Sequence, residues 1–179
     1  MEEKVGVWKA NLTNGLILGL VGVVYSLVMY FLDLTFNQVQ GYVFIVVQIA
    51  LLYFLLKSYR DNYMHGQITY GQSVGAGVVI NLYSAIIGAI FIYILYTVID
   101  SGLTEKQLAF LEEKMLEKGA PQEAVDAGIA IQRKILKPVI MAPFSILSAM
   151  FGGTILSLLI SIFIKKEGNP LIDTPPSQQ

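Results

Sequence analysis

Residues 138–164 read PVIMAPFSILSAMFGGTILSLLISIFI, and none of these 27 residues carries a charge. Three further stretches of the 179-residue chain also lack Asp, Glu, Lys and Arg: 10–32, 34–56 and 62–99. An α-helix rises about 1.5 Å per residue, so about 20 apolar residues cross the roughly 30 Å hydrocarbon core of a bilayer. Each stretch is long enough, and the sequence therefore predicts an integral membrane protein.

The composition agrees with this interpretation. Hydrophobic residues make up 55% of the chain and charged residues 14%, and the mean hydropathy is +0.62. These values lie outside the usual range for a soluble domain. The first apolar stretch is longer than the core of a signal peptide, which has about 7–15 residues, so we expect a retained span. A net charge of −1 gives no reason to expect nucleic acid as a partner.

The charge-free stretches predict one membrane domain over residues 1–167 with four spans, and a disordered tail at 168–179 that contains three prolines. The third stretch is too long for one crossing, so its polar first part belongs to a loop at 57–72. The expected spans are 12–32, 36–56, 73–99 and 139–164.

The segment 103–137 between the last two spans is polar and has helical periodicity. Thr104 and Gln107 have the spacing of a capping box, which marks the start of a helix. Gly119 predicts its end, and Pro121 predicts the start of a second helix. We therefore expect an all-α fold: a membrane four-helix bundle with a short amphipathic helical hairpin that rests on the membrane face or on the spans.

The distribution of basic residues predicts the orientation. Four spans place both termini on one side, and the two sides carry six Lys and Arg residues each. The first two spans usually dominate insertion, and here Lys4 and Lys9 precede them while their connecting turn has no basic residue. We expect both termini in the cytoplasm.

Side chains suited to catalysis or metal binding are missing from the span interiors. No Asp, Glu, Lys, Arg or His lies within a span, and the chain has one histidine and no cysteine. Intramembrane charges usually mark the active groups of pumps and membrane enzymes, and cysteine and histidine are the common zinc ligands. We therefore predict no catalytic, cofactor-binding or metal-binding residue, and we expect a protein that is not an enzyme.

Small residues recur at every fourth position in the last two spans. The fourth span carries Ser145, Ala149, Gly153, Ser157 and Ser161, and the third carries Ser73, Gly77, Asn81, Ala85 and Ala89. This spacing allows helix backbones to approach closely. Two interpretations remain open: the third and fourth spans pack on each other, or they form an interface with a second copy or another membrane protein.

A few polar residues lie at depth in the spans. They are Gln48, Asn81, Ser84, Ser148 and Thr154. They bond one another across helices, because an unpaired amide in hydrocarbon is costly, or they line a narrow path for a solute.

Lys57 and Arg60 follow the second span. Arg60 can bind a lipid phosphate through its forked guanidinium. Alternatively, both side chains anchor the span at the interface, with Asp61 as the partner of Arg60.

Several of these segments together resemble a known family. A basic and aromatic run at 57–61 precedes GQITYGQ at 66–72, the third span ends in YILYTVID at 93–100, and the last span ends in IFIKK at 162–166. This order resembles the bacterial membrane family called domain of unknown function 4199, over about residues 8–167. The resemblance implies a four-span protein of the bacterial inner membrane, chiefly in Bacteroidetes, with no established activity.

The sequence thus favours a non-enzymatic membrane protein whose function depends on helix packing. It is a scaffold, an accessory subunit or a small assembly, with membrane lipids and a second copy or other membrane proteins as partners and no cofactor. The alternative is a channel or transporter for a neutral or lipid-like solute.

Overall fold

The computed structural model describes residues 5–167, and the helices it contains confirm the prediction of an all-α bundle. Four helices are long and apolar enough to cross a membrane: α1 (Val7–Phe31), α2 (Gln38–Tyr63), α3 (Tyr70–Ile94) continued by the π-helix η1 (Leu95–Ile99), and α6 (Pro138–Ile164). Two shorter helices, α4 (Leu103–Glu117) and α5 (Gln122–Ile135), connect η1 to α6.

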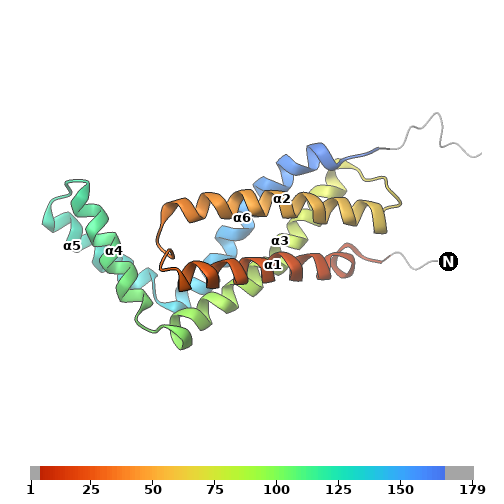
Figure 1. Ribbon diagram of the computed structural model, residues 1–179. Helices are drawn as coiled ribbons and strands as arrows, with labels where there is room; N and C mark the ends of the chain where they lie inside the picture. Colours follow the sequence, from red (N-terminus) through yellow and green to blue (C-terminus); the bar gives the residue numbers. More distant parts are fainter. Residues whose placement is uncertain (1–4, 168–179) are drawn as a thin grey trace, which may run out of the picture.

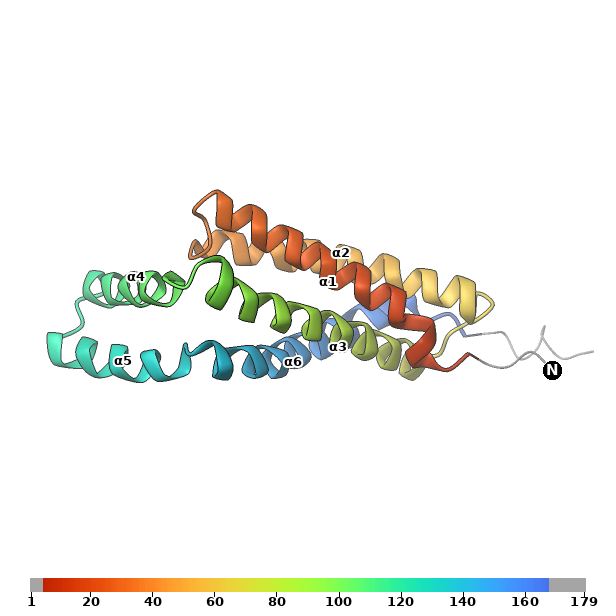
Figure 2. The same ribbon diagram turned by 90° about the horizontal axis from the view of Figure 1, so that it is seen from below.

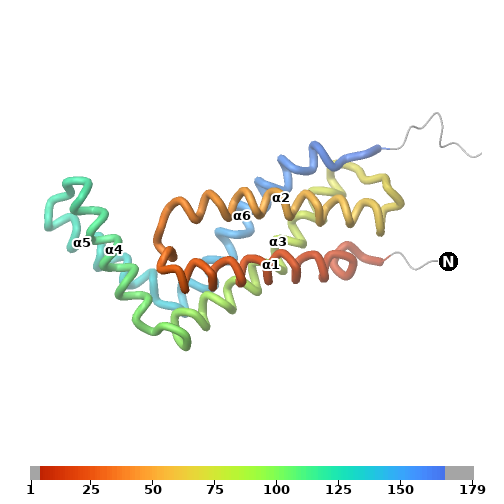
Figure 3. The backbone as a smooth tube through the Cα atoms, viewed as in Figure 1, coloured from red at the N-terminus to blue at the C-terminus, as the bar shows by residue number. Residues whose placement is uncertain are grey.

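The helix α3 is the centre of the bundle. It packs extensively against α6 on one side and against α1 on the other, whereas α2 makes fewer contacts with each of the other spans (Figures 1 and 2). The α4–α5 hairpin extends from one end of the bundle, and the described chain starts and stops at the other end (Figure 3). We call these the hairpin end and the terminal end.

Two expected boundaries differ from the structure. The helix α1 begins at Val7, before the expected position 12, and the expected loop at 57–72 is wrong because α2 continues to Tyr63. No glycine or proline interrupts residues 57–63, so the charged residues there extend the helix. The chain turns at Gly66, whose φ of 78° is natural for glycine. The expected tail at 168–179 lies outside the described residues.

The predicted capping box is also in a different place. Gly102 precedes α4, and Gln107 Oε1 instead accepts a hydrogen bond from the Tyr96 hydroxyl at 2.8 Å. A capping box is found at α3, where Thr69 Oγ1 accepts from the Gln72 backbone N–H at 3.3 Å and Gln72 Oε1 accepts from the Thr69 N–H at 3.0 Å. The spacing of Ser/Thr and Gln alone therefore did not identify the correct helix start.

The hairpin projects past the ends of the spans and does not fold back over them (Figures 1 and 2). At its base, Phe110 of α4 stacks on Phe36 in the α1–α2 turn with ring centroids 5.7 Å apart. This contact and the Tyr96–Gln107 hydrogen bond attach the hairpin to the bundle.

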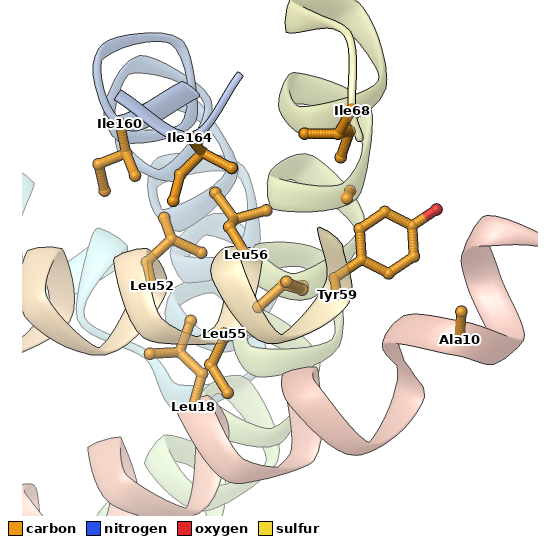
Figure 4. Close-up of a cluster of buried hydrophobic side chains, with 11 residues drawn as sticks. Ala10, Leu18, Leu52, Leu55, Leu56, Tyr59, Ile68, Ile160 and Ile164 are labelled. Atoms are coloured by element: carbon orange, nitrogen blue, oxygen red, sulfur yellow. The ribbon is translucent and has the colours of Figure 1, made fainter. Parts of the chain in front are cut away.

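The terminal end of the bundle is tightly packed. Leu52 and Leu56 of α2 and Ile164 of α6 are fully buried in a cluster that also contains Leu18 of α1 (Figure 4). Ile68, in the α2–α3 loop, exchanges two backbone hydrogen bonds with Lys166, at 2.9 and 3.0 Å. Within a bilayer such packing holds helices together mainly by van der Waals contact.

Candidate functional site

The small residues of α3 and α6 meet along one antiparallel line. Near the terminal end, Ser161 Oγ donates a hydrogen bond to Ser73 Oγ at 2.8 Å. The next pair is Gly77 and Ser157, where a Cβ added to Gly77 would lie 2.5 Å from Ser157 Oγ. The two backbones are therefore so close that Gly77 cannot carry a side chain without a shift of α6.

Asn81 occupies the next position on this line and is only 3% exposed. Its Nδ2 donates to the backbone oxygen of Gly77 at 2.8 Å. The same group lies 3.4 Å from the oxygen of Gly153 and 3.3 Å from Ser157 Oγ, both on α6. Its Oδ1 accepts from Gln48 Nε2 of α2 at 3.2 Å. One amide thus joins three spans.

The contact between α1 and α3 also depends on glycine. Gly15 faces the Tyr83 side chain, and a Cβ added to Gly19 would lie 2.7 Å from Ile87 Cδ1. The Tyr83 hydroxyl donates to the backbone oxygen of Trp8 at 3.5 Å. The helix α3 is therefore in close contact with α1 and α6, whereas α2 makes fewer contacts with it.

Toward the hairpin end, the four spans separate around a cavity of about 540 Å³. Continued in steps of four residues, the α3–α6 line brings Ala85 opposite Ala149 and Ala89 opposite Ser145. All four of these residues line the cavity. The small residues spaced four apart on α3 and α6 therefore allow close helix contact at the terminal end, and at the hairpin end they form part of the cavity wall.

The cavity opens on the side of the bundle, between α2 and α6. Its exposed lining residues lie mainly on these two helices: Ile45 of α2, Ser148, Ala149, Gly152 and Ile155 of α6, and in addition Ser26 of α1. Nearer the terminal end, α2 and α6 are brought together by the buried cluster that contains Leu52. In a membrane, this opening faces the lipid.

Side chains from the spans and the hairpin meet one turn beyond the cavity. Tyr30 follows the lining residue Ser26 by four positions, and its hydroxyl donates to Asp100 Oδ2 at 3.3 Å. Asp100 Oδ2 also pairs with Lys106 Nζ of α4 at 2.6 Å. The hydrogen bond from Lys106 holds the pKa of Asp100 below its ordinary value, and Asp100 raises the pKa of Lys106. We call Tyr30, Asp100 and Lys106 the hairpin-base cluster.

The cavity carries polar groups but no charged side chain. Its polar lining residues are Ser26, Gln48, Asn81, Ser84, Ser145 and Ser148. The Asn81 amide bonds Gly77 within α3 and also contacts α2 and α6, and Ser145 Oγ donates to the backbone oxygen of Ala142 at 2.7 Å. Ser26, Gln48, Ser84 and Ser148 retain hydrogen-bonding capacity. The site can therefore hold an uncharged molecule with some polar atoms.

Lys57 and Arg60 lie at the terminal end, apart from the cavity. Arg60 Nε pairs with Asp61 Oδ1 at 2.8 Å, and Arg60 Nη1 donates to the backbone oxygen of Ile164 at 3.3 Å. Arg60 thus satisfies a carbonyl at the C-terminus of α6, where positive charge is also favourable. The Lys57 side chain is exposed.

Two buried polar residues were missed from the sequence. Asn11 is fully buried and Asn14 is 8% exposed, and Asn14 Nδ2 donates to Asn11 Oδ1 at 3.1 Å. We expected the first span to begin at position 12, which put Asn11 outside it. The spacing of the two residues places them on one helix face and was the available signal.

Of the polar residues that the sequence offered as lining of a solute path, Gln48, Asn81, Ser84 and Ser148 line the cavity and Thr154 does not. The lining glycines Gly22, Gly88 and Gly152 were missed. No group of three His, Cys, Asp or Glu side chains within residues 5–167 is placed to hold a metal ion.

Comparison with other proteins places the chain in a family. The family described as "Protein of unknown function (DUF4199)" matches residues 13–166, which is most of the chain. No curated protein and no solved structure matches it. The matched segment contains most of α1, the other three long helices, the hairpin and the cavity, and the chain therefore belongs to the DUF4199 family of proteins of unknown function.

Proposed function

We propose that this membrane protein acts without catalysing a reaction and binds a neutral, lipid-like molecule between its four spans. The observation that carries the proposal is the cavity of about 540 Å³ at the hairpin end. Ligand sites usually have volumes of about 300–1,000 Å³ and mostly apolar walls with a few polar groups. The opening between α2 and α6 favours exchange of the ligand with the bilayer over conduction of a solute across the bilayer.

The packing of α3 on α6 supports this choice over a homo-oligomer. The small residues at the terminal half of the two ladders are occupied by contacts within the chain: Ser73, Gly77 and Asn81 of α3, and Gly153, Ser157 and Ser161 of α6. Their spacing therefore gives no separate argument for a second copy. The cavity, in contrast, gives a binding site for the alternative function, which involves a lipid-like solute.

A scaffold or accessory subunit is the second candidate, and the hairpin favours it. Ile131 of α5 is 60% exposed and Leu116 of α4 is 45% exposed, although both lie outside the spans. Exposed apolar residues outside the bilayer favour contact with another protein. Native mass spectrometry of the purified protein tests this: a co-purifying protein that is lost in Ile131→Lys supports it, and a partner-free monomer contradicts it.

We also propose a location in the bacterial inner membrane, with both termini in the cytoplasm. The terminal end carries Lys9, Lys57, Arg60, Lys165 and Lys166, whereas the α1–α2 turn at the hairpin end has no basic residue. The bias around the first two spans supports this orientation. The cavity then lies in the half of the bundle nearer the periplasm.

Lys57 supports a weaker contact with an anionic lipid headgroup at the cytoplasmic face. Arg60 is already bonded to Asp61 and Ile164, so Lys57 is the more available cation. A single exposed lysine near an anionic surface contributes about 1 kcal/mol.

The binding proposal is tested by filling the cavity. Gly88 lies in the wall, and an added Cβ there meets no atom within 4 Å, so Gly88→Leu fills space without a clash at the first carbon. Gly75 on the same helix is equally open but does not line the cavity, which makes Gly75→Leu the matched control. Both proteins are purified in mild detergent, and their bound lipids are identified by mass spectrometry.

We expect a neutral lipid that is enriched over the bulk membrane in the wild type and in Gly75→Leu, and is lost in Gly88→Leu. Bound lipid identical in all three proteins would contradict the proposal.

A further inference from the structure

The free hydrogen-bonding groups of the cavity come from all four spans. Ser26 is on α1, Gln48 on α2, Ser84 on α3 and Ser148 on α6, and all four line the cavity. Within residues 5–167, none of the three serine hydroxyls makes a hydrogen bond, although a serine in a helix often donates to the carbonyl four residues before it. Each hydroxyl can both donate and accept.

Gln48 is held in position by Asn81. Its Nε2 donates to Asn81 Oδ1 at 3.2 Å, while Asn81 is fixed by its own bond to the Gly77 oxygen at 2.8 Å. The bond to Asn81 uses one hydrogen of the Gln48 amide, and no other bond of Gln48 is made within residues 5–167. Gln48 therefore offers a fixed carbonyl oxygen and one N–H.

These groups suit an uncharged partner. Transfer of an isolated charge into an apolar site is far more costly than transfer of a hydroxyl or an ester, and no charged side chain of the cavity could compensate for it. A hydroxyl or ester group, in contrast, matches two serine hydroxyls and an amide.

We propose that the ligand is a neutral lipid whose headgroup carries hydroxyl or ester oxygens, bound by Gln48, Ser84 and Ser148, and that it enters from the bilayer between α2 and α6. This inference rests on the proposed binding function. The exposed residues Ser148 and Gly152 lie at the opening, so the headgroup reaches the polar groups by passing the lipid-facing edge of α6. The acyl chain lies against the apolar wall that includes Phe44 and Leu156.

Three matched photoactivatable probes test the ligand class in nanodiscs that hold the full chain. One is a monoacylglycerol, the second is lysophosphatidic acid with the same chain, and the third is the corresponding alkane without a headgroup. Labelled peptides are identified by mass spectrometry. The variants are Gln48→Leu and the double variant Ser84→Ala with Ser148→Ala, with Ser101→Ala outside the spans as the control and Gly88→Leu as the filled cavity.

We expect the monoacylglycerol to label the cavity walls of α3 and α6 at least about tenfold more than either other probe. Each lost hydrogen bond should lower this labelling about fivefold, without changing that of the alkane. Ser101→Ala should behave like the wild type, and Gly88→Leu should remove all labelling of the walls.

The outcomes separate this inference from the proposed function. Equal wall labelling by the monoacylglycerol and the alkane, unchanged in Gln48→Leu and in the double serine variant, would overturn the headgroup preference and leave lipid binding intact. Strong labelling by lysophosphatidic acid would overturn the requirement for a neutral ligand. Failure of every probe to label the walls, or labelling that persists in Gly88→Leu, would overturn the binding function itself.

Discussion

Asn81 on α3 accepts a hydrogen bond from Gln48 on α2 over 3.2 Å, and this side-chain contact joins α2 to the central helix of the bundle. It lies where the packed half of the molecule meets the cavity. Asn81 also reaches Gly153 and Ser157 on α6, so one side chain sets the positions of three helices. The cavity and the packing of the bundle therefore share a residue.

Replacement of Asn81 by leucine should destabilise the protein. The change removes the bonds to Gln48 and α6 and leaves the Gln48 amide without its partner. Interhelical hydrogen bonds in membranes contribute about 0.6 kcal/mol on average, and an unpaired polar group adds a further cost, so we expect a loss of about 1–3 kcal/mol. Unfolding of the wild type and of Asn81→Leu by SDS in mixed micelles measures the difference in their free energies of unfolding.

The control for this prediction is Asn62→Leu at the exposed end of α2. Asn62 bonds only Ser58, at 3.0 Å, and we expect a change below about 0.5 kcal/mol. Equal stability of the two variants would show that Asn81 does not hold the helices together.

Two adjacent glycines of α6 should respond in opposite ways to alanine. A Cβ at Gly153 would lie 2.5 Å from Asn81 Cγ, whereas a Cβ at Gly152 meets no atom within 4 Å. Gly153→Ala should therefore cost about 1–3 kcal/mol, since it forces α3 and α6 apart. Gly152→Ala should be neutral or stabilising by up to about 1 kcal/mol, because alanine favours the helix. The same micelle unfolding assay compares the two variants. A larger loss of stability for Gly152→Ala would contradict the packing of Gly153 against Asn81.

The sequence was sufficient to predict the long helices because each depends on a local property, an uninterrupted apolar stretch. Its limits appear at the ends of helices. Residues 57–63 were expected in a loop because they are charged and polar, yet charge alone does not end a helix that has left the hydrocarbon. The turn came instead at Gly66, where the backbone adopts a positive φ.

The ladder of small residues was visible in the sequence, but its two structural consequences were not. Whether a small residue allows a close contact or leaves a space depends on the residue opposite it. Gly77 faces Ser157 in close contact, while Gly88, on the same helix, faces open space. This information belongs to the tertiary arrangement and could not be derived from one helix at a time.

Arg60 and Lys57 should have separable effects. Arg60→Ala removes the bonds to Asp61 and to the Ile164 oxygen, so we expect a loss of about 1 kcal/mol in the free energy of unfolding. Lys57→Ala should change the stability by less than about 0.5 kcal/mol but lower the amount of co-purifying anionic lipid. Unfolding and lipid mass spectrometry on both variants test this. An unchanged amount of anionic lipid in Lys57→Ala would contradict the proposed contact between Lys57 and a lipid headgroup.

The hairpin-base cluster should loosen in acid. The folded-state pKa of Asp100 lies below its ordinary value of 3.8, so its contribution to stability is present above that value and is lost as the pH falls through the folded pKa. The pKa of Lys106 is raised from 10.5, so its contribution is present below 10.5 and is lost as the pH rises through the folded pKa. Between these two pH limits both side chains stay charged, and the contribution of the Asp100–Lys106 pair to stability does not change.

A fluorinated phenylalanine at position 110 reports this change, because Phe110 stacks on Phe36 beside the cluster. We expect its fluorine NMR signal to be unchanged from about pH 5 to 9 and to move below about pH 4. The acid transition should be absent in Asp100→Asn and retained in Glu123→Gln, whose exposed side chain lies on α5. An acid transition that persists in Asp100→Asn would assign it to another group.

The predicted orientation can be tested with single cysteines, because the natural chain has none. Asn62 at the terminal end and Lys118 at the tip of the hairpin are both exposed. With the termini in the cytoplasm, a membrane-impermeant maleimide should label Lys118→Cys from outside, once the outer membrane is permeabilised. It should reach Asn62→Cys only after the inner membrane is opened. The reverse pattern would place the cavity in the cytoplasmic half and require its neutral lipid to come from the inner leaflet.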